Sequence, residues 1–355
     1  MLLRSRQARV AVAALLWCGA AGAAATPASH PEPPARQEPL KPTPRNLRGL
    51  PGKLKLDLSS GLPVINARIG QETLRLTVDT GATWSLLRPD AAKRLGLPLR
   101  ESAELKARDA AGEVRAVEAA HVDTLVLETI GEDGEPGAPI ELGDFDLVVL
   151  ESPVVAGVGA DGILGLPLFR RMVARFDFEN ETLELGGDSL ADADDARTLP
   201  VRASAGGLMT IEGRFERPEG EAEAAAEKEV RNLVLDTGFS GLLHLPEKFV
   251  TELVGSDADG AEGTSATALR ERKFERVPLD HDLVIGPYRL LDPIASVFSE
   301  ARVTGDGSIG TGLLRHFTVT LDLPSRRVRL EAPKDRVQLE DKRRLQPQSD
   351  DVSPR

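Results

Sequence analysis

The chain carries an internal duplication. Residues 161–185 align without a gap to residues 306–330. The aligned identities begin with Asp161-Gly162 on Asp306-Gly307 and continue with Gly165 on Gly310, Arg170 on Arg315, Asp177 on Asp322 and Leu185 on Leu330. Self-similarity at a fixed spacing indicates a repeated structural unit. The chain is therefore predicted to fold as two homologous modules rather than as one domain.

A second pair of matching motifs lies upstream of this repeat. Asp79-Thr80-Gly81 is echoed by Asp236-Thr237-Gly238. The spacing between the two copies is 157 positions here but 145 positions in the downstream repeat, so one module is 12 residues longer between its motifs. A surface loop absorbs such a difference at small entropic cost.

Local patterns within each module favour strands. Leu74, Leu76 and Val78 alternate with polar residues ahead of Asp79, and apolar 233–235 precede Asp236. Residues 176–185 are expected to form a hairpin about a polar turn, with Pro324-Ser325 at the equivalent turn. Short helices are predicted over Pro89–Leu95 and Leu166–Met172. The fold class is all-β, with two homologous lobes and few short helices.

The N-terminus has the features of a signal peptide over residues 1–25. Basic Arg4, Arg6 and Arg9 precede a short apolar run over 10–17, and Ala23-Ala24-Ala25 offers a cleavage site. Export to the periplasm is expected, with secretion as an alternative. Lipid anchoring through Cys18 is disfavoured because Trp17 precedes it. Since Cys18 is the only cysteine, the mature chain would form no disulfide.

Length and composition suit a two-domain protein that does not bind nucleic acid. The 355 residues carry a formal net charge of -12, and nucleic-acid binding requires a basic face. After residue 25 no run reaches the roughly 20 apolar residues of a membrane span. Residues 214–231 are expected to form an exposed acidic insertion. The predicted divisions are 26–51 as a Pro-rich linker or pro-segment, 52–187 as the first lobe, 188–200 as the interlobe linker, 201–332 as the second lobe and 333–355 as a disordered charged tail.

One Asp-Thr-Gly motif in each module suggests chemistry by a pair of carboxyls. Hydrolysis of a peptide bond without a metal needs one carboxylate to take a proton from water. It also needs a neutral carboxylic acid to protonate the carbonyl oxygen. Two carboxyls in contact meet both needs because they share one proton and titrate as a pair. Asp79 and Asp236 are thus the candidate catalytic residues.

Over about residues 52–332 the sequence resembles the aspartic peptidases of the pepsin and retropepsin kind. The match is closer to retropepsin-like bacterial members with both lobes in one chain than to pepsin itself. The resemblance implies an endopeptidase acting on peptides or unfolded proteins, as a monomer with an active-site cleft between its two β-barrel lobes, without cofactor or metal. It implies that Asp79 and Asp236 are catalytic. The implied supporting residues are Thr80 and Thr237, gripping across the interface, Gly81 and Gly238, shaping the loops, and the bracing motifs Ile163-Leu164-Gly165 and Ser308-Ile309-Gly310.

The chain departs from pepsin at two kinds of position. Pepsin-like lobes carry Ser or Thr directly after Asp-Thr-Gly, whereas Ala82 and Phe239 stand there in this chain. Pepsin also has a flap tyrosine, yet the only tyrosine is Tyr288. A first flap is expected near residues 108–117, around Ala110, Ala111 and Gly112, and a second near 262–269.

Other functions have weaker support in the sequence. The same fold without activity would make a two-lobed peptide-binding or scaffolding protein, which is the main alternative. Gly157–Gly162 matches a dinucleotide fingerprint but lies in the duplicated bracing region, without the βαβ unit that the fingerprint needs. The five histidines lack the spacing of zinc ligands. Asp192, Asp194 and Asp195 resemble a calcium loop only loosely.

Overall fold

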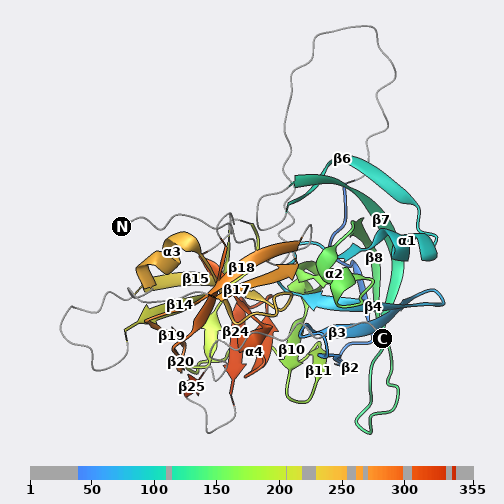
Figure 1. Ribbon diagram of the computed structural model, residues 1–355. Coiled ribbons are helices and arrows are strands. Elements are labelled where there is room, and N and C mark those ends of the chain that lie inside the picture. Colours follow the sequence, from blue (N-terminus) through green and yellow to red (C-terminus); the bar gives the residue numbers. More distant parts are fainter. Residues whose placement is uncertain are drawn as a thin grey trace, which may run out of the picture.

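The computed structural model describes residues 39–108, 114–204, 206–217, 229–253, 261–266, 271–298, 306–332 and 338–340. Within these ranges strands predominate and the helices are short. Two β-rich lobes lie side by side (Figure 1), the first coloured blue to green and the second yellow to red. None of the helices in the described ranges is long and apolar enough to cross a membrane.

The first lobe is built on an eight-stranded sheet with the order β1-β8-β5-β9-β4-β3-β7-β6. Because β7 also pairs with β8, the strands from β8 to β7 close into a barrel. The strands are β1 (Asn46–Arg48), β3 (Val64–Ile69), β4 (Glu72–Asp79), β5 (Leu86–Leu87), β6 (Leu99–Arg108), β7 (Val114–Leu127), β8 (Ile140–Val149) and β9 (Gly162–Gly165). The helices are α1 (Pro89–Arg94), α2 (Pro153–Gly157) and the 3-10 helix η1 (Leu166–Arg171).

The second lobe repeats this plan with one break. In the first lobe the long strand β7 pairs with β8 and also with β3. In the second lobe β18 pairs with β21, the counterpart of β8, and β19 pairs with β14, the counterpart of β3. The single long strand β7 is thus replaced by two shorter strands. The elements are β13 (Arg202–Ala203), β14 (Met209–Glu216), β15 (Glu229–Asp236), β16 (Leu243–Pro246), α3 (Glu247–Leu253), β17 (Ala261–Ala266), β18 (Glu271–Pro278), β19 (Asp282–Ile285), β20 (Tyr288–Leu291), β21 (Ile294–Phe298), β22 (Gly307–Gly310), α4 (Thr311–Leu314) and β25 (Gln338–Glu340).

A six-stranded sheet joins the two lobes. Its order is β12-β24-β23-β10-β11-β2, with β2 (Gly52–Lys55), β10 (Val173–Asp177), β11 (Thr182–Leu185), β12 (Thr198–Pro200), β23 (Thr318–Asp322) and β24 (Arg327–Glu331). At its centre β10 pairs antiparallel with β23 and Arg175 lies opposite Thr320. Val173 faces Asp322 just as Asp177 faces Thr318. The two equivalent strands are therefore related by a local twofold axis.

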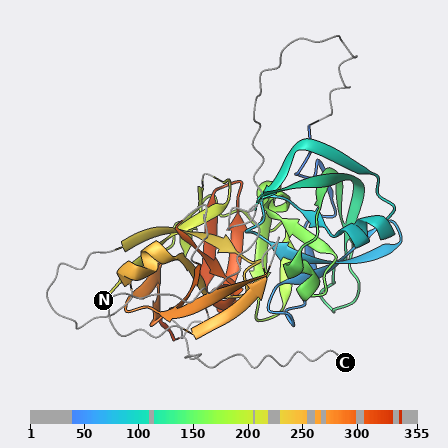
Figure 2. The ribbon, with the colours of Figure 1, turned by 45° about the horizontal axis from the view of Figure 1, so that its top comes forward.

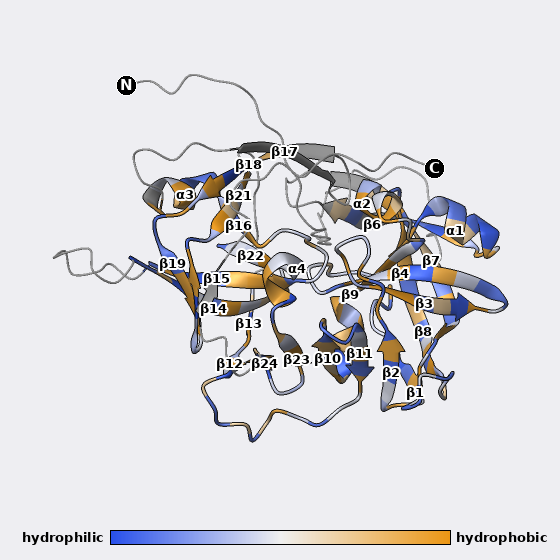
Figure 3. Cartoon of the chain, turned by 60° about the horizontal axis from the view of Figure 1, so that its bottom comes forward, coloured by the Kyte–Doolittle hydropathy of each residue, from blue (hydrophilic) through white to orange (hydrophobic). Residues whose placement is uncertain are grey.

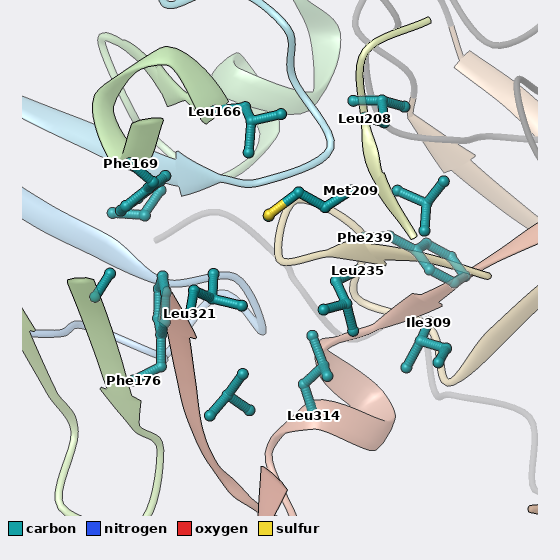
Figure 4. Close-up of a cluster of buried hydrophobic side chains, with 14 of the residues drawn as sticks. Leu166, Phe169, Phe176, Leu208, Met209, Leu235, Phe239, Ile309, Leu314 and Leu321 are labelled. Carbon is teal, nitrogen blue, oxygen red and sulfur yellow. The ribbon is translucent and has the colours of Figure 1, made fainter. Parts of the chain in front are cut away.

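One continuous apolar core runs through both lobes and under this sheet. Figure 4 shows Leu166 and Phe169 of the first lobe close to Met209 and Leu235 of the second. Phe176 is fully buried and stacks on Phe178 with ring centroids 5.9 Å apart. Truncating a buried phenylalanine to alanine typically costs about 3–5 kcal/mol. The lobes are thus packed against each other and not joined only by a linker.

The hydropathy of the residues differs between the interior of the molecule and its surface. In Figure 3 the central part of β15 is orange, whereas α1 at the periphery is largely blue. The last four residues of β4 and of β15 are buried in both lobes. Each of these strands therefore ends inside the molecule, where the two lobes meet.

The structure confirms the all-β, two-lobed fold and both hairpins. The helices predicted over 89–95 and 166–172 correspond to α1 and η1. Residues 214–231 begin and end in β14 and β15, and 218–228 lie outside the described residues, as does the predicted signal peptide.

Three segments contain strands where none was expected. β1 lies within 26–51, β12 within 188–200 and β25 within 333–355. Each pairs with a single strand of a sheet: β1 with β8, β12 with β24 and β25 with β20. Three-residue strands of this kind depend on a partner strand far away in the sequence, so their own residues carry little signal.

Candidate active site

Asp79 and Asp236 lie at the ends of equivalent strands. Asp79 ends β4, which runs parallel to β9 with Asp79 opposite Gly165. Asp236 ends β15, which runs parallel to β22 with Asp236 opposite Gly310. Each aspartate is only 2% exposed. The duplication thus places one carboxyl from each lobe at the interface between them, next to the bracing motif predicted for it.

The two threonines form a reciprocal grip between the lobes. The Thr80 hydroxyl donates to the carbonyl oxygen of Leu235 at 2.7 Å, and the Thr237 hydroxyl donates to that of Val78 at 2.7 Å. The Thr80 N–H donates to Thr237 Oγ1 at 3.0 Å, and the Thr237 N–H to Thr80 Oγ1 at 3.1 Å. These buried bonds fix the loops against each other, as the resemblance implied.

The glycines allow the two carboxyls to approach the opposite loops. A Cβ atom at Gly81 would overlap the carboxyl of Asp236, and one at Gly238 would overlap that of Asp79. The Gly81 N–H donates to Asp79 Oδ1 at 2.7 Å, and the Gly238 N–H to Asp236 Oδ1 at 3.0 Å. The two carboxyls also hydrogen-bond to each other, which requires that one of them carries a proton.

Burial sets the protonation of this pair. It raises the pKa of Asp79 to about 6, against the lowering effect of the Gly81, Ala82 and Gly238 N–H groups and of the hydrogen bond to Asp236. Burial also raises the pKa of Asp236 well above its ordinary value, and the charge of Asp79 raises it further. Because like charges in contact cannot both form cheaply, the pair loses its two protons in well-separated steps.

The bracing motifs support the aspartate loops from behind. Ile163, Leu164 and Ile309 are buried beside β4 and β15. Gly165 and Gly310 are required because a Cβ there would overlap carbonyl groups of the aspartate loop in the same lobe, including those of Ala82 and Phe239 respectively. The structure thus brings together all of these predicted supporting residues with the two aspartates.

Two acidic residues that support the site were not predicted to do so. The backbone N–H of Arg75 donates to Asp161 Oδ2 at 2.9 Å, and that of Asn232 donates to Asp306 Oδ2 at 2.9 Å. These carboxylates hold β4 and β15 four residues before Asp79 and Asp236. The signal was their identity in the duplicated alignment, which alone does not reveal a backbone partner.

Ser85 is a further supporting residue that the sequence analysis missed. Its hydroxyl oxygen accepts the N–H of Gly165 at 3.0 Å, whereas the N–H of Gly310 in the second lobe is accepted by the carbonyl oxygen of Leu242 at 3.1 Å. A side chain in one lobe therefore does what a backbone group does in the other.

The predicted first-flap residues Ala110, Ala111 and Gly112 lie outside the described residues. The strands that flank them form a hairpin, with Arg108 opposite Val114. The second predicted flap, near 262–269, falls on another hairpin, in which Ala266 of β17 lies opposite Glu271 of β18. In Figure 1 and Figure 2 this second hairpin reaches toward α2 of the first lobe, which β17 contacts.

The alternative ligand sites gain no geometric support. Gly157–Gly162 ends α2 and leads into β9, whereas a dinucleotide fingerprint follows a strand and opens a helix. Among the described residues, no group of three or more His, Cys, Asp or Glu side chains is arranged to hold a metal ion.

Comparison with known proteins finds distant structural neighbours and a family match in the first lobe. No curated protein matches the chain. Among solved structures, the chain is similar to conglutin gamma, a basic 7S globulin from lupine seeds, at 14% identity and a TM-score of 0.45, covering 82% of this chain and 96% of that one. Basic 7S globulin from soybean is 11% identical with a TM-score of 0.42, covering 82% and 95%. Residues 65–168, which include Asp79 and its bracing motif, match the family model described as aspartyl protease.

Proposed function

We propose that this protein is an aspartic endopeptidase. The observation that carries the proposal is the buried, hydrogen-bonded pair of Asp79 and Asp236, supplied by equivalent loops of the two lobes. The match of residues 65–168 to the aspartyl protease family supports it independently. A pair of carboxyls that shares one proton supplies both the base and the acid that are needed to split a peptide bond with water alone.

In the proposed reaction a water molecule lies between the dyad and the substrate carbonyl. The ionised carboxylate removes a proton from this water as its oxygen bonds to the carbonyl carbon, while the protonated carboxyl gives its proton to the carbonyl oxygen. The tetrahedral intermediate then collapses. The C–N bond breaks, the leaving nitrogen takes the proton gained from water, and the hydroxyl proton returns to the dyad. The pair thus ends singly protonated, as it began.

The proposal also covers the oligomeric state, the localisation and the substrates of the protein. Because one chain supplies both aspartates, the protein is proposed to act as a monomer. We also propose that it is exported through the signal peptide expected in residues 1–25 and acts on peptides or unfolded proteins in the periplasm.

The test is hydrolysis of an unfolded protein such as casein by the purified chain. A peptide mimic with a hydroxyl in place of the scissile amide should block cleavage, because it resembles the tetrahedral intermediate. Asp79→Asn is the matched control for contaminating proteases. Cleavage that is equal in the parent and in Asp79→Asn would contradict the proposal. A parent protein that binds peptides without cleaving them would instead favour the peptide-binding alternative.

A further inference from the structure

Residues 40–48, called here the N-terminal strap, lie against the first lobe. β1 within the strap pairs with β8, and the N–H of Arg45 donates to the carbonyl oxygen of Gly143 at 3.0 Å. On another side, Arg171 donates from Nη1 to the carbonyl oxygens of Pro44 and Arg45 at 3.1 and 2.8 Å. Pro44 is buried. The backbone of the strap is thus bonded along much of its length.

Asp146 of β8 holds the start of the strap. This carboxylate is 1% exposed and accepts the backbone N–H of Lys41 at 2.7 Å, while the Asp146 N–H donates to the Lys41 carbonyl at 2.7 Å. Arg100 Nη2 lies 2.7 Å and His121 Nδ1 3.0 Å from the other carboxylate oxygen. A buried carboxylate is costly unless donors satisfy it. The Lys41 backbone is one of the three groups that do so.

The side chain of Lys41 pairs with a second carboxylate, that of Asp144. Its Nζ lies 3.0 Å from Asp144 Oδ1, and both side chains are partly exposed, at 24% and 31%. Asp144 also faces Arg45 at 3.7 Å and His121 at 3.7 Å. Ion pairs of this kind contribute little to stability. The strap is therefore held by the backbone of Lys41 more than by its charge.

The strap also reaches the support of the Asp79 loop. Leu40 packs against a buried apolar cluster that includes Ala82, Leu86 and Ile163. Ala82 directly follows Gly81, and its carbonyl oxygen accepts the N–H of Leu166 at 2.7 Å. Removing the strap would expose the side of this cluster that Leu40 covers and would leave Asp146 without one of its donors.

We infer that residues 40–48 remain in the mature protein as a positioning strap for the Asp79 loop, so that any proteolytic maturation cuts before Leu40. The segment 26–51, expected to be a linker or a pro-segment, is thereby divided into a removable part and a retained part. This inference rests on the proposed function only for its activity measurements.

The first experiment compares chains that begin at residue 26, residue 39 and residue 49. The first two should have equal kcat and equal thermal midpoints. The third should unfold at a lower temperature and lose roughly 10- to 100-fold in kcat with KM nearly unchanged, because small misplacements of a reacting group cost rate more than binding. A synthetic peptide of residues 39–48 should restore both quantities by strand addition. Equal kcat and midpoint in all three chains would overturn the inference.

A pair of point variants covers the case in which the shortest chain fails to fold. Lys41→Pro removes the N–H that Asp146 accepts, whereas Lys41→Ala removes only the side chain. We expect the proline variant to lose roughly tenfold in kcat and the alanine variant to stay within about twofold. Asp144→Asn, a surface control, should match the alanine variant. Equal kcat and equal midpoints in Lys41→Pro and Lys41→Ala would contradict the role of the backbone clasp.

The third measurement needs no activity. N-terminal sequencing of the protein isolated from a producing cell should find its first residue at or before position 40, and a first residue after Leu40 would refute the inference. If the parent hydrolyses nothing, the proposed function fails. The thermal midpoints, their rescue by the peptide and the mature N-terminus still decide whether the strap is retained.

Discussion

The two aspartate loops share a backbone contact to the helix after the bracing motif but have different side chains behind them. In the first lobe the N–H of Leu166 donates to the carbonyl of Ala82 at 2.7 Å, and in the second the N–H of Thr311 donates to that of Phe239 at 2.7 Å. The first loop continues from small Ala82 to bulky Trp84. The second continues from bulky Phe239 to Gly241, where a Cβ would overlap the Phe239 ring.

This exchange of large and small residues teaches which features of the duplicated unit are fixed. The hydrogen bonds that aim the carboxyls are retained in both lobes, while the large side chain stands at the first position after the motif in one loop and at the third position in the other. Interiors tolerate such exchanges when total volume is kept. If backbone geometry is what matters for the reaction, equivalent changes in the two loops should have equal effects on activity, whereas changes behind the loops should have unequal effects on stability.

The largest expected effect is the loss of either aspartate. Asp79→Asn and Asp236→Asn should each reduce kcat by roughly 1,000-fold or more, because each carboxyl is needed in a different protonation state. The rate of casein hydrolysis measures this. If hydrolysis survived the loss of one aspartate, the two loops would not be equivalent in the reaction.

The same variants should be more stable than the parent at neutral pH. Burial raises the folded-state pKa of both carboxyls, so the unfolded chain releases these protons first as the pH rises above about 4. The dyad thus costs stability above that pH and nothing below it. Denaturant unfolding at pH 7 and pH 3 measures the difference. Asn variants that are less stable at pH 7 would point to unfolding as the cause of lost activity.

Alanine at either loop glycine is the next largest change. Gly81→Ala and Gly238→Ala would each push a Cβ into the carboxyl of the opposite lobe, and should lower kcat about 100-fold to similar extents. Gly187→Ala is the control, since its Cβ would have no atom within 4 Å. A loss confined to one of the two loops would show that the lobes are not equivalent in the reaction.

A comparison of His244 with its first-lobe counterpart tests how a residue behind the loop affects the stability of the fold. His244 is fully buried in β16, where the first lobe has Leu87 at the equivalent spacing, and burial lowers its pKa well below 6.5. The unfolded chain binds this proton first as the pH falls below about 6.5, so His244 costs stability in acid. His244→Leu should therefore lose less stability than the parent between pH 7 and pH 5, as followed by denaturant unfolding. Equal losses would contradict a buried, neutral histidine.

The smallest expected effect is that of Ser85→Ala. It removes the acceptor of the Gly165 N–H, and leaving that buried donor unpaired should cost about 1–3 kcal/mol in unfolding free energy. Leu242→Ala is not an equivalent change because the second lobe uses a backbone carbonyl. Ser85→Thr, which retains a hydroxyl, is the matched control. An alanine variant as stable as the parent would remove Ser85 from the supporting residues.

Motifs that are local in sequence could be predicted, whereas contacts between distant segments could not. Asp79 and Asp236 stood out because each begins the same three-residue motif in a duplicated unit. The hairpin that contains Phe176 followed from alternation over ten residues. The pairing of Arg175 with Thr320 joins strands 145 residues apart, and neither strand specifies its partner.

The supporting contacts escaped prediction for a related reason. The carboxylates of Asp161 and Asp306 bond to backbone N–H groups, and any residue type except proline can offer such a donor. The sequence therefore identifies the acidic residue but not the backbone N–H group that it binds. The strap was expected to be unpacked because its prolines favour an extended chain. An extended segment can also pair with a strand, and the strap pairs with β8 in this way.

The pH–rate profile of kcat/KM tests the shared proton most directly. Below the lower apparent pKa of the dyad no carboxylate is present to act as base, and above the higher one no acid is present. Because burial raises both pKa values and neither Ala82 nor Phe239 offers a side-chain hydroxyl, activity should extend over about pH 5 to 7. Ala82→Ser should move the optimum toward acid. A bell-shaped profile with activity between about pH 5 and pH 7 is the predicted result, and activity confined below about pH 4 would contradict the account.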